Sequence, residues 1–599
     1  MKTVPFQSVE LTGGYLFDRQ ELNRKTTIHA VYDRFVETGR FAAFDFNYKK
    51  GDEILPHIFW DSDVAKWMEA AAYILEKHPD PKLERIVDET VEKIKAHQLP
   101  DGYFNVHHTV VAPELRWKDR SHHELYCAGH LMEAAVAYAD ATGKTDFLTC
   151  MEKYADHIRQ VFVEDKSAVF ATPGHEEIEL ALVKMYRYTG KKKYLDLAAH
   201  FINERGKQVE DDMAFYAQSH KPVREQAEAK GHAVRALYLY TGMAYLAAET
   251  GEQALTDACH TLFEDVTARQ MYVTGATGST YRGEAFTNAY DLPNELAYAE
   301  TCASIALMLF GKAMLDLENN AKYADAIERA LYNGVLSGIS QDGKAFFYEN
   351  PLEINLAERF QAPFAKPHHA ITERVECFEC SCCPPNLIRL FATLGNYIYG
   401  MEGDTLFVNQ FLSSKMEKDG VSCMQKTNYP HNGCVKLQVT GAKRVAVRIP
   451  AWCEKFELNK PCVMQNGYAV VENDGMEEII LGLDVSPRYV WADTRVLRDV
   501  GKVCVMRGPV VYCAEGVDNG AHLHSFLLPA TPNFRETENK AFPLPCLELD
   551  CEKYLPFTSG KLYENHAPVR EKATLTLIPY HCFANRGESD MLVWMHVKS

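Results

Sequence analysis

The sequence predicts a chain in which a helical region precedes a β-rich region. Up to about residue 399, apolar side chains recur at intervals of three and four, as in amphipathic helices. Beyond that point apolar and polar side chains alternate, as in strands with one buried face. The chain has 599 residues, more than one compact core accommodates. We therefore expect an α/α toroid followed by one or two β-sandwiches of about a hundred residues each.

Paired helices with short connections make up the helical region. Such pairs are typical of a toroid in which one helix of each pair forms an inner ring and the other an outer ring. The alternative is a helical-repeat solenoid, but no motif recurs at a fixed period. Residues 1–51 are expected to form a short strand and a loop before these helices. The expected helices span residues 61–77, 82–97, 123–141, 144–163, 175–189, 192–204, 231–250, 252–270, 301–317, 320–337 and 384–399.

Four long segments without helical periodicity interrupt this region: 99–120, 208–230, 272–300 and 341–383. They are rich in polar, aromatic and cysteine residues. Long loops on a rigid scaffold often carry function, so we expect these segments to line a central cleft of the toroid.

The β-rich region shows short stretches of alternating polarity. A Gly-Pro pair at 508–509 interrupts one of them, which indicates a turn or a bulge. The expected strands lie at residues 405–408, 435–439, 444–449, 478–481, 503–512, 574–578 and 591–595.

Composition and charge exclude several classes of function. The formal net charge of −18 argues against a nucleic-acid partner, because such binding requires a surface rich in Lys and Arg. No apolar stretch is long enough to span a membrane, and the N-terminus lacks the apolar core of a signal peptide. The 17 cysteines are odd in number and scattered. We therefore expect a cytoplasmic protein with reduced thiols and no membrane partner.

The most informative stretch contains Cys377, Cys380, Cys382 and Cys383. Two prolines follow directly, which predicts that Cys382 and Cys383 lie at the start of a helix. The N-terminal end of a helix stabilises a thiolate, and clustered thiolates suit a cation such as zinc.

A second candidate group is Glu300 with Cys302. In a regular helix these two side chains would point apart, so a shared site requires a helix that begins near Thr301. With Cys382 and Cys383 they make a plausible tetrahedral set for zinc. Two alternatives stay open from spacing alone. Cys377 and Cys380 are the true ligand pair in one of them, and in the other all four clustered thiols are reduced and buried.

Several short motifs occur in order over most of the chain. The most specific are Cys-Cys-Pro-Pro-Asn at 382–386 and Glu-Thr-Cys at 300–302. The others lie at 124–130, 173–177, 231–236, 281–286, 328–334, 507–509 and 584–587. Together these motifs resemble glycoside hydrolase family 127, the β-L-arabinofuranosidases.

The resemblance implies a fold and a mechanism. The fold is an (α/α)6 barrel, which we place at residues 1–399, followed by two β-sandwich domains at 400–501 and 502–599. The mechanism is that of a retaining hydrolase with a zinc-bound cysteine as nucleophile. Cys382 is then the nucleophile and Glu284 the general acid/base. Glu300, Cys302 and Cys383 complete the zinc shell with Cys382.

The resemblance also points to sugar-binding side chains. Without it, a histidine in or beside a helix is more often structural, and Glu328 reads equally well as a carboxylate on a helix surface. A neutral imidazole both donates and accepts, which suits a sugar hydroxyl. The implied substrate-binding residues are His130, His175, His232, Glu328 and Tyr348.

We therefore expect an exo-acting enzyme that releases terminal β-L-arabinofuranose from a small oligosaccharide, with a homodimer as the assembly. One alternative keeps the fold but changes the substrate to another furanoside or to an acidic sugar derived from pectin. Convergence of several Arg or Lys side chains on the cleft would favour the acidic sugar. Another alternative is a non-catalytic sugar-binding or scaffold protein with structural zinc, in which Glu284 lies far from Cys382.

Overall fold

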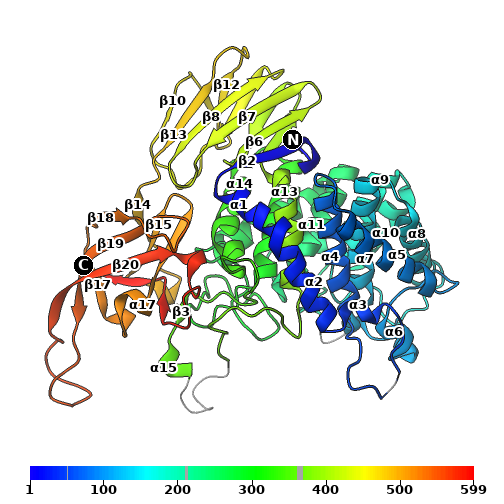
Figure 1. The fold of residues 1–599 in the computed structure, drawn as a ribbon, viewed down its shortest axis with the longest axis horizontal. Helices are drawn as coiled ribbons and strands as arrows, with labels where there is room; N and C mark the ends of the chain where they lie inside the picture. Colours follow the sequence, from blue (N-terminus) through cyan, green and yellow to red (C-terminus); the bar gives the residue numbers. More distant parts are fainter. Residues whose placement is uncertain (50, 209–212, 360–367, 599) are drawn as a thin grey trace.

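The computed structural model describes residues 1–49, 51–208, 213–359 and 368–598. A large helical region lies on one side of the molecule and two β-rich regions lie on the other (Figure 1). The expected order, helices first and strands after about residue 399, is confirmed apart from short strands before that point. Residues 209–212 and 360–367, which belong to two of the segments expected at the cleft, lie outside the described residues.

The long helices begin within three residues of their expected positions. Three of them end well before the expected residue, at Asp265, Arg329 and Ala392, and the first two continue as π-helix to Gln270 and Val335. Residues 15–37, expected within a loop, instead form two helices, and Ile28, Val31 and Phe35 are buried along one face of the second. None of the helices described here is long and apolar enough to cross a membrane. The helices are α1 Tyr15–Leu22, α2 Ile28–Glu37, α3 Arg40–Ala43, α4 Trp60–Leu75, α5 Pro81–His97, α6 His107–Val110, α7 Glu124–Thr142, α8 Asp146–Arg159, α9 Ile178–Thr189, α10 Lys192–Glu204, α11 Ala233–Thr250, α12 Gln253–Asp265, α13 Thr301–Leu317, α14 Ala321–Arg329, α15 Leu356–Arg359, α16 Cys383–Ala392 and α17 Gly516–Asn519.

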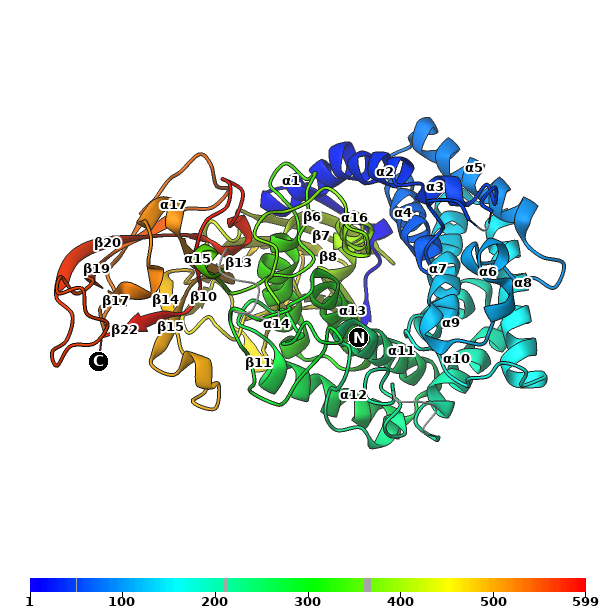
Figure 2. The ribbon, with the colours of Figure 1, turned by 90° about the horizontal axis from the view of Figure 1, so that it is seen from below.

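Six helices make a closed ring. Contacts run from α4 to α7, α9, α11, α13 and α16, and from α16 back to α4. A second set packs outside them, with α5 on α4, α8 on α7, α10 on α9, α12 on α11 and α14 on α13. Figure 2 shows this arrangement from below. The ring helices are apolar around most of their circumference because they are covered on both sides.

Two six-stranded sheets follow the helices, and the first strands of the chain complete them. β1 pairs with β4 and β2 pairs with β6, which attaches the N-terminus to the middle of the chain. Alternate residues of β8 are buried, as the alternating sequence predicted. In spatial order, one sheet is β1 Lys2–Thr3, β4 Tyr399–Glu402, β5 Thr405–Val408, β9 Arg444–Arg448, β12 Tyr468–Glu472 and β11 Val463–Gln465; the other is β10 Phe456–Leu458, β13 Ile479–Leu483, β8 Cys434–Thr440, β7 Val421–Thr427, β6 Ser413–Lys418 and β2 Val9–Gly13.

The C-terminal strands form one continuous ten-stranded sheet. Pairing of β15 with β16 closes part of it into a ring, since β22, β17, β19 and β20 connect the same two strands by the other route. β3 joins its edge from the segment before the cysteine cluster. In order, the strands are β14 Pro487–Val490, β15 Lys502–Arg507, β22 Met595–Val597, β17 Phe526–Leu528, β19 Cys546–Tyr554, β20 Arg570–Pro579, β16 Val510–Glu515, β21 Met591–Leu592 and β3 Glu353–Ile354, with β18 Phe534–Thr537 paired to β19.

Candidate active site

A cavity of about 280 Å³ lies among the ends of the ring helices. Its walls come from α4, α7, α11 and α13, and from the segments that precede α11, α13 and α16. Three of the four segments expected at a central cleft contribute lining residues, represented by Tyr216, Glu284 and Cys382. No residue of the fourth segment, 99–120, is among the described residues that line it. Phe59 and His123, which directly precede α4 and α7, line it as well.

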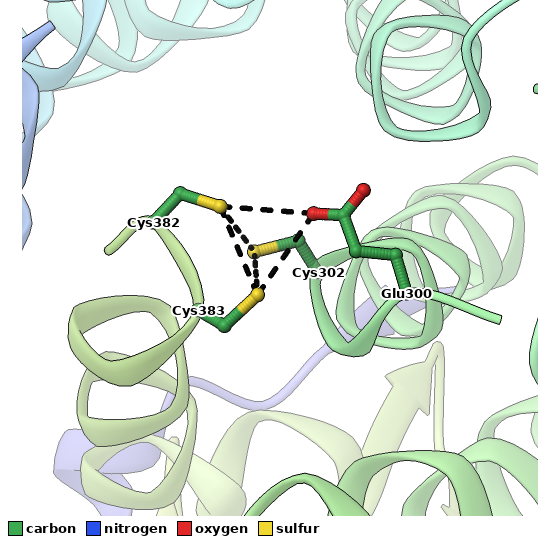
Figure 3. A group of neighbouring side chains, drawn as sticks. All are labelled: Glu300, Cys302, Cys382 and Cys383. Atoms are coloured by element: carbon green, nitrogen blue, oxygen red, sulfur yellow. Dashed lines mark hydrogen bonds between the residues drawn. The ribbon is translucent and has the colours of Figure 1, made fainter. Parts of the chain in front are cut away.

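Three thiols and one carboxylate lie together, those of Cys302, Cys382, Cys383 and Glu300 (Figure 3). All of these residues except Cys383 line the cavity. The Cys302 sulfur lies 3.6 Å from that of Cys382 and 3.4 Å from that of Cys383. The sulfurs of Cys382 and Cys383 are 3.7 Å apart. Glu300 Oε1 lies 3.7 Å from the Cys382 sulfur and 3.9 Å from the Cys383 sulfur. The four ligand atoms therefore approximate a tetrahedron.

The dimensions and chemistry of this cluster fit a metal ion. Zinc binds thiolate sulfur at about 2.3 Å, which sets the edges of a tetrahedral site at about 3.8 Å. The sulfur-to-sulfur distances are close to that edge. The second carboxylate oxygen of Glu300 is buried without a hydrogen-bond partner, and a bound cation would satisfy it. Cys302, Cys383 and Glu300 are buried, whereas Cys382 is only partly covered and lines the cavity.

Local structure explains how the cluster forms. Cys383 is the first residue of α16, and Pro384 and Pro385 occupy its first turn, so the predicted helix start is confirmed. α13 begins at Thr301, also as predicted, which leaves Glu300 in extended backbone. The Thr301 amide donates to the carbonyl of Tyr348, and this bond fixes the start of α13 against the next segment.

Glu284 reaches the cavity from a strained turn. Its φ of 52° lies in the left-handed region, which non-glycine residues rarely adopt. The turn is attached to the start of α11, because the Ala233 amide donates to the Glu284 carbonyl. The Glu284 carboxylate lies 3.1 Å from His232 Nε2 and accepts a 3.1 Å hydrogen bond from the Tyr348 hydroxyl. The same hydroxyl lies 3.6 Å from the Cys382 sulfur, so Tyr348 joins the carboxylate to the thiol.

The electrostatics of the cavity distinguish its two glutamates. Burial opposes charge on Glu284, but hydrogen bonds from His232 and Tyr348 outweigh it and lower the pKa of that carboxyl to about 2. Burial, together with negative charge on Cys382 and Glu284, raises the pKa of Glu300 well above its usual value. Burial opposes ionisation of Cys302 as well, yet hydrogen bonds from the neighbouring thiols lower its pKa to about 6. A cation held by Glu300 would keep that carboxylate ionised, and the proton of this carboxyl pair would then belong to Glu284.

The predicted sugar-binding residues do not all lie here. His175, His232 and Tyr348 line the cavity. His130 does not: it is fully buried one layer deeper, between Tyr126 and the carboxylate of Glu177. The prediction that His130 contacts sugar is corrected accordingly. His130 lies two turns inside α7, where its ring packs within the helix bundle.

Glu328 also lies elsewhere, so the prediction that it binds a sugar hydroxyl is corrected. It belongs to α14, and its buried carboxylate accepts hydrogen bonds from strand β9 and from two loops of the six-stranded sheets. Arg448 donates at 2.6 Å, and the Tyr429 hydroxyl and the Trp452 indole donate at 2.7 Å and 2.9 Å. This carboxylate therefore attaches the helical region to the six-stranded sheets and is not available to a substrate.

Replacing Glu328 with alanine should therefore destabilise the chain rather than alter substrate binding. The change leaves the buried Arg448 guanidinium with Asp325 as its remaining carboxylate partner. Breaking a buried ion pair typically costs about 3–5 kcal/mol of unfolding free energy, and the contact with Asp325 offsets part of that loss. Denaturant unfolding measures this loss. E264A, which removes an exposed carboxylate from α12, serves as the control and should change stability by less than about 0.5 kcal/mol. A Glu328 variant with unchanged stability and a raised KM would restore the sugar-binding role.

The structure separates the two remaining thiols of the cysteine cluster. Cys377 contacts the hydroxyl of Ser381 at 3.0 Å and does not belong to the four-residue ligand group. Cys380 lines the cavity, and its sulfur lies 3.9 Å from the Tyr348 hydroxyl, but it too is outside that group. The alternative in which Cys377 and Cys380 form the ligand pair is thus not favoured by this geometry.

Sequence reasoning missed several residues of the wall, among them Asp63, His123 and Arg235. His123 adopts left-handed backbone directly before α7 and so turns its ring into the cavity. Its position at the predicted start of a helix is the sequence feature that could have indicated a place in the cavity wall. Asp63 lies in the first turn of α4, and its sequence position gives no comparable signal.

Comparison with known proteins identifies the family of this chain. The model "Beta-L-arabinofuranosidase, GH127 catalytic domain" matches residues 8–396. The corresponding middle-domain model matches 405–477, and the "Glycoside hydrolase family 127 C-terminal domain" matches 487–596. A non-reducing end β-L-arabinofuranosidase from Bifidobacterium longum subsp. longum is 39% identical, over 91% of this chain and 90% of that relative.

Solved structures extend the comparison. A GH127 β-L-arabinofuranosidase from Geobacillus stearothermophilus T6 superposes with a TM-score of 0.92 at 41% identity, covering 98% of this chain and all of that one. A second GH127 β-arabinofuranosidase gives a TM-score of 0.90 at 34% identity, covering 100% and 98%. Family models, relatives and folds thus agree over nearly the whole length, and the chain belongs to glycoside hydrolase family 127, a family of glycosidases.

Proposed function

We propose that this chain is an exo-acting, retaining glycosidase that releases terminal β-L-arabinofuranose from short glycans. The observation that carries the proposal is that Cys382 and Glu284 line one cavity and both contact the Tyr348 hydroxyl. A retaining glycosidase needs a nucleophile and a proton donor that reach the same glycosidic bond. The sugar is inferred from the names of the relatives at 39% and 41% identity.

In the first step the Cys382 sulfur attacks the anomeric carbon while the bond to the leaving oxygen breaks. Glu284 gives its proton to that oxygen, so the alcohol leaves neutral. The sugar is then held by a carbon–sulfur bond to Cys382. His232 and Tyr348 hold the carboxyl group of Glu284 in place through the two hydrogen bonds described above.

In the second step water attacks the same carbon and the carbon–sulfur bond breaks. Glu284, now ionised, accepts the proton from water, and the Cys382 thiolate is regenerated. Two inversions at one carbon give net retention of configuration. A zinc ion held by Glu300, Cys302, Cys382 and Cys383 would supply a deprotonated Cys382 at neutral pH, where a free thiol is mostly protonated.

An acidic sugar is less well supported as the substrate. Among the described residues that line the cavity, Arg235 is the one Lys or Arg, and its guanidinium bonds to the Gly174 carbonyl and lies over the Tyr216 ring. Asp63, Glu284 and Glu300 line the same cavity. A substrate carboxylate would face these three groups, so a neutral sugar suits the cavity better.

The non-catalytic alternative required Glu284 to lie far from Cys382. A single tyrosine hydroxyl contacts both side chains, and this geometry supports an enzyme instead.

Our proposal retains the (α/α)6 barrel at 1–399, the β-sandwich domains at 400–501 and 502–599, a homodimer and a cytoplasmic location. The closed ring of six inner helices supports the barrel.

Metal content and hydrolysis measured together test this function. The chain, purified under reducing conditions, should carry one zinc ion and hydrolyse p-nitrophenyl β-L-arabinofuranoside. Removal of the ion by a chelator should abolish turnover, because Cys382 then reverts to a thiol, and added zinc should restore it.

Two results would contradict the proposal in different ways. Zinc without turnover would indicate another sugar or a structural metal. Turnover that survives complete removal of metal would show that Cys382 does not depend on a bound cation.

A further inference from the structure

Asp63 is a buried carboxylate in the wall of the cavity that the proposed mechanism does not use. It lies in the first turn of α4 and is fully shielded from solvent. One carboxylate oxygen accepts a 2.8 Å hydrogen bond from Arg40 Nε. The other oxygen, Oδ1, is buried and has no hydrogen-bond partner among the described residues. Asp63 is therefore only half satisfied at a position that faces the cavity.

The neighbouring cation does not complete this carboxylate. Lys66, one turn further along α4, is fully buried and donates its hydrogen bond at 3.0 Å to the Tyr126 hydroxyl. No ion pair of 4.0 Å or less joins Lys66 to Asp63 in the part of the chain that is described. A buried acceptor left unpaired is unfavourable, so Oδ1 requires a donor that arrives with a ligand.

The chemistry of that donor follows from the acceptor. An ionised carboxylate accepts hydrogen bonds and donates none, so its partner must carry O–H or N–H. A neutral furanose in this cavity presents hydroxyl groups. The bond would be charge-assisted and therefore stronger than a bond between neutral groups.

We propose that Asp63 accepts a hydrogen bond from one hydroxyl of the sugar bound over Cys382 and thereby sets the enzyme's preference for a sugar that carries that hydroxyl. The assignment rests on the proposed function and adds to it a residue that determines specificity. A sugar that lacks this hydroxyl leaves Oδ1 of the buried carboxylate unpaired, and the site therefore discriminates against it.

Arg40 has a different role, that of a positioning residue. Its Nη2 donates to the carbonyl of Glu379 at 2.8 Å and to that of Phe378 at 3.3 Å, while its Nε holds Asp63. The guanidinium is buried and lies over the rings of Phe35 and Trp60. Arg40 thus fixes Asp63 and the backbone of the cysteine cluster relative to each other.

The test compares four p-nitrophenyl β-L-arabinofuranosides: the parent and its 2-deoxy, 3-deoxy and 5-deoxy analogues. Asp63→Asn keeps the shape but can turn a donor toward the sugar. It should lower kcat/KM for the parent by roughly 100-fold, the effect of losing a hydrogen bond to a charged group. For the one analogue that lacks the recognised hydroxyl, wild type and variant should differ by less than about 3-fold.

Two further variants separate binding from structure. Asp61→Asn changes a buried aspartate of the same turn, whose carboxylate accepts from the Val106 amide and does not line the cavity. It should affect all four substrates by less than about 3-fold. Arg40→Lys keeps the charge but loses the planar guanidinium that bonds to Asp63 and to the backbone of the cysteine cluster at the same time. It should lower kcat for all four substrates alike.

The outcomes test the role of Asp63 separately from the proposed glycosidase function. If Asp63→Asn lowers kcat/KM equally for the parent and all three analogues, Asp63 only anchors Arg40, and the assignment is wrong. A wild-type chain that binds zinc but hydrolyses none of the four glycosides contradicts the proposed function itself. Unchanged thermal midpoints for Asp63→Asn and Asp61→Asn exclude misfolding as the cause of a selective loss.

Discussion

Replacement of Cys382 by serine should lower kcat/KM for a β-L-arabinofuranoside by on the order of 10⁴-fold or more. Deleting a nucleophile removes the covalent route altogether, and the hydroxyl of serine is not ionised at neutral pH. Of the three cysteines in the ligand group, Cys382 is the one that lines the cavity and is only partly buried. Steady-state hydrolysis of the p-nitrophenyl glycoside measures the loss.

Cys377→Ser is the matched control for this variant. Cys377 lies in the same segment, but its sulfur contacts Ser381 and is not part of the ligand group, and a hydroxyl preserves that contact. It should retain activity within about 3-fold and bind zinc normally. Zinc content must be measured for Cys382→Ser as well. Full activity in that variant would remove Cys382 from the mechanism, and activity lost only in proportion to zinc would assign it a ligand role alone.

Replacement of Glu284 by glutamine should produce a loss that depends on the leaving group. A general acid typically contributes about 10²–10⁴-fold, and it matters most when the leaving alcohol is a poor one. The variant should therefore fail on a natural disaccharide. With p-nitrophenol as the leaving group the first step needs little help, so the sugar should be transferred rapidly to Cys382, and slow attack by water should then limit turnover.

Azide provides the complementary readout for Glu284→Ala. Azide attacks without a general base, so it should restore turnover of the p-nitrophenyl glycoside and yield the glycosyl azide. Equal losses for good and poor leaving groups, with no effect of azide, would show that Glu284 is not the acid/base. The hydrogen bonds from His232 and Tyr348 would then serve only to hold a structural carboxylate.

The candidate metal-binding group could be predicted from sequence because its residues lie at helix starts. The prolines after Cys383 and the threonine after Glu300 mark where α16 and α13 begin. Those starts direct the ligands toward one point. Local sequence does not show that Cys302 and Cys382, which are 80 residues apart, lie together. That prediction came from the motifs that resemble the family.

The sequence does not show how deeply each side chain is buried within the ring of helices. His123 and His130 lie seven residues apart on one segment, and only the backbone at His123 turns a ring into the cavity. Glu328 fits a helix-surface pattern equally well whether a sheet or a solvent layer covers that surface. Its partner Arg448 comes from a strand 120 residues later, so only the packing of domains reveals the contact. The ring closure of β15 with β16 is likewise a matter of long-range pairing.

The most direct test of the central claim is to trap the covalent intermediate in Glu284→Gln. The variant is mixed with p-nitrophenyl β-L-arabinofuranoside, quenched in acid and digested, and its peptides are analysed by mass spectrometry. The account predicts a mass increase of one anhydropentose on the peptide that contains Cys382, localised to its sulfur. An adduct on a carboxylate such as Glu300, or hydrolysis without any adduct, would contradict a cysteine nucleophile.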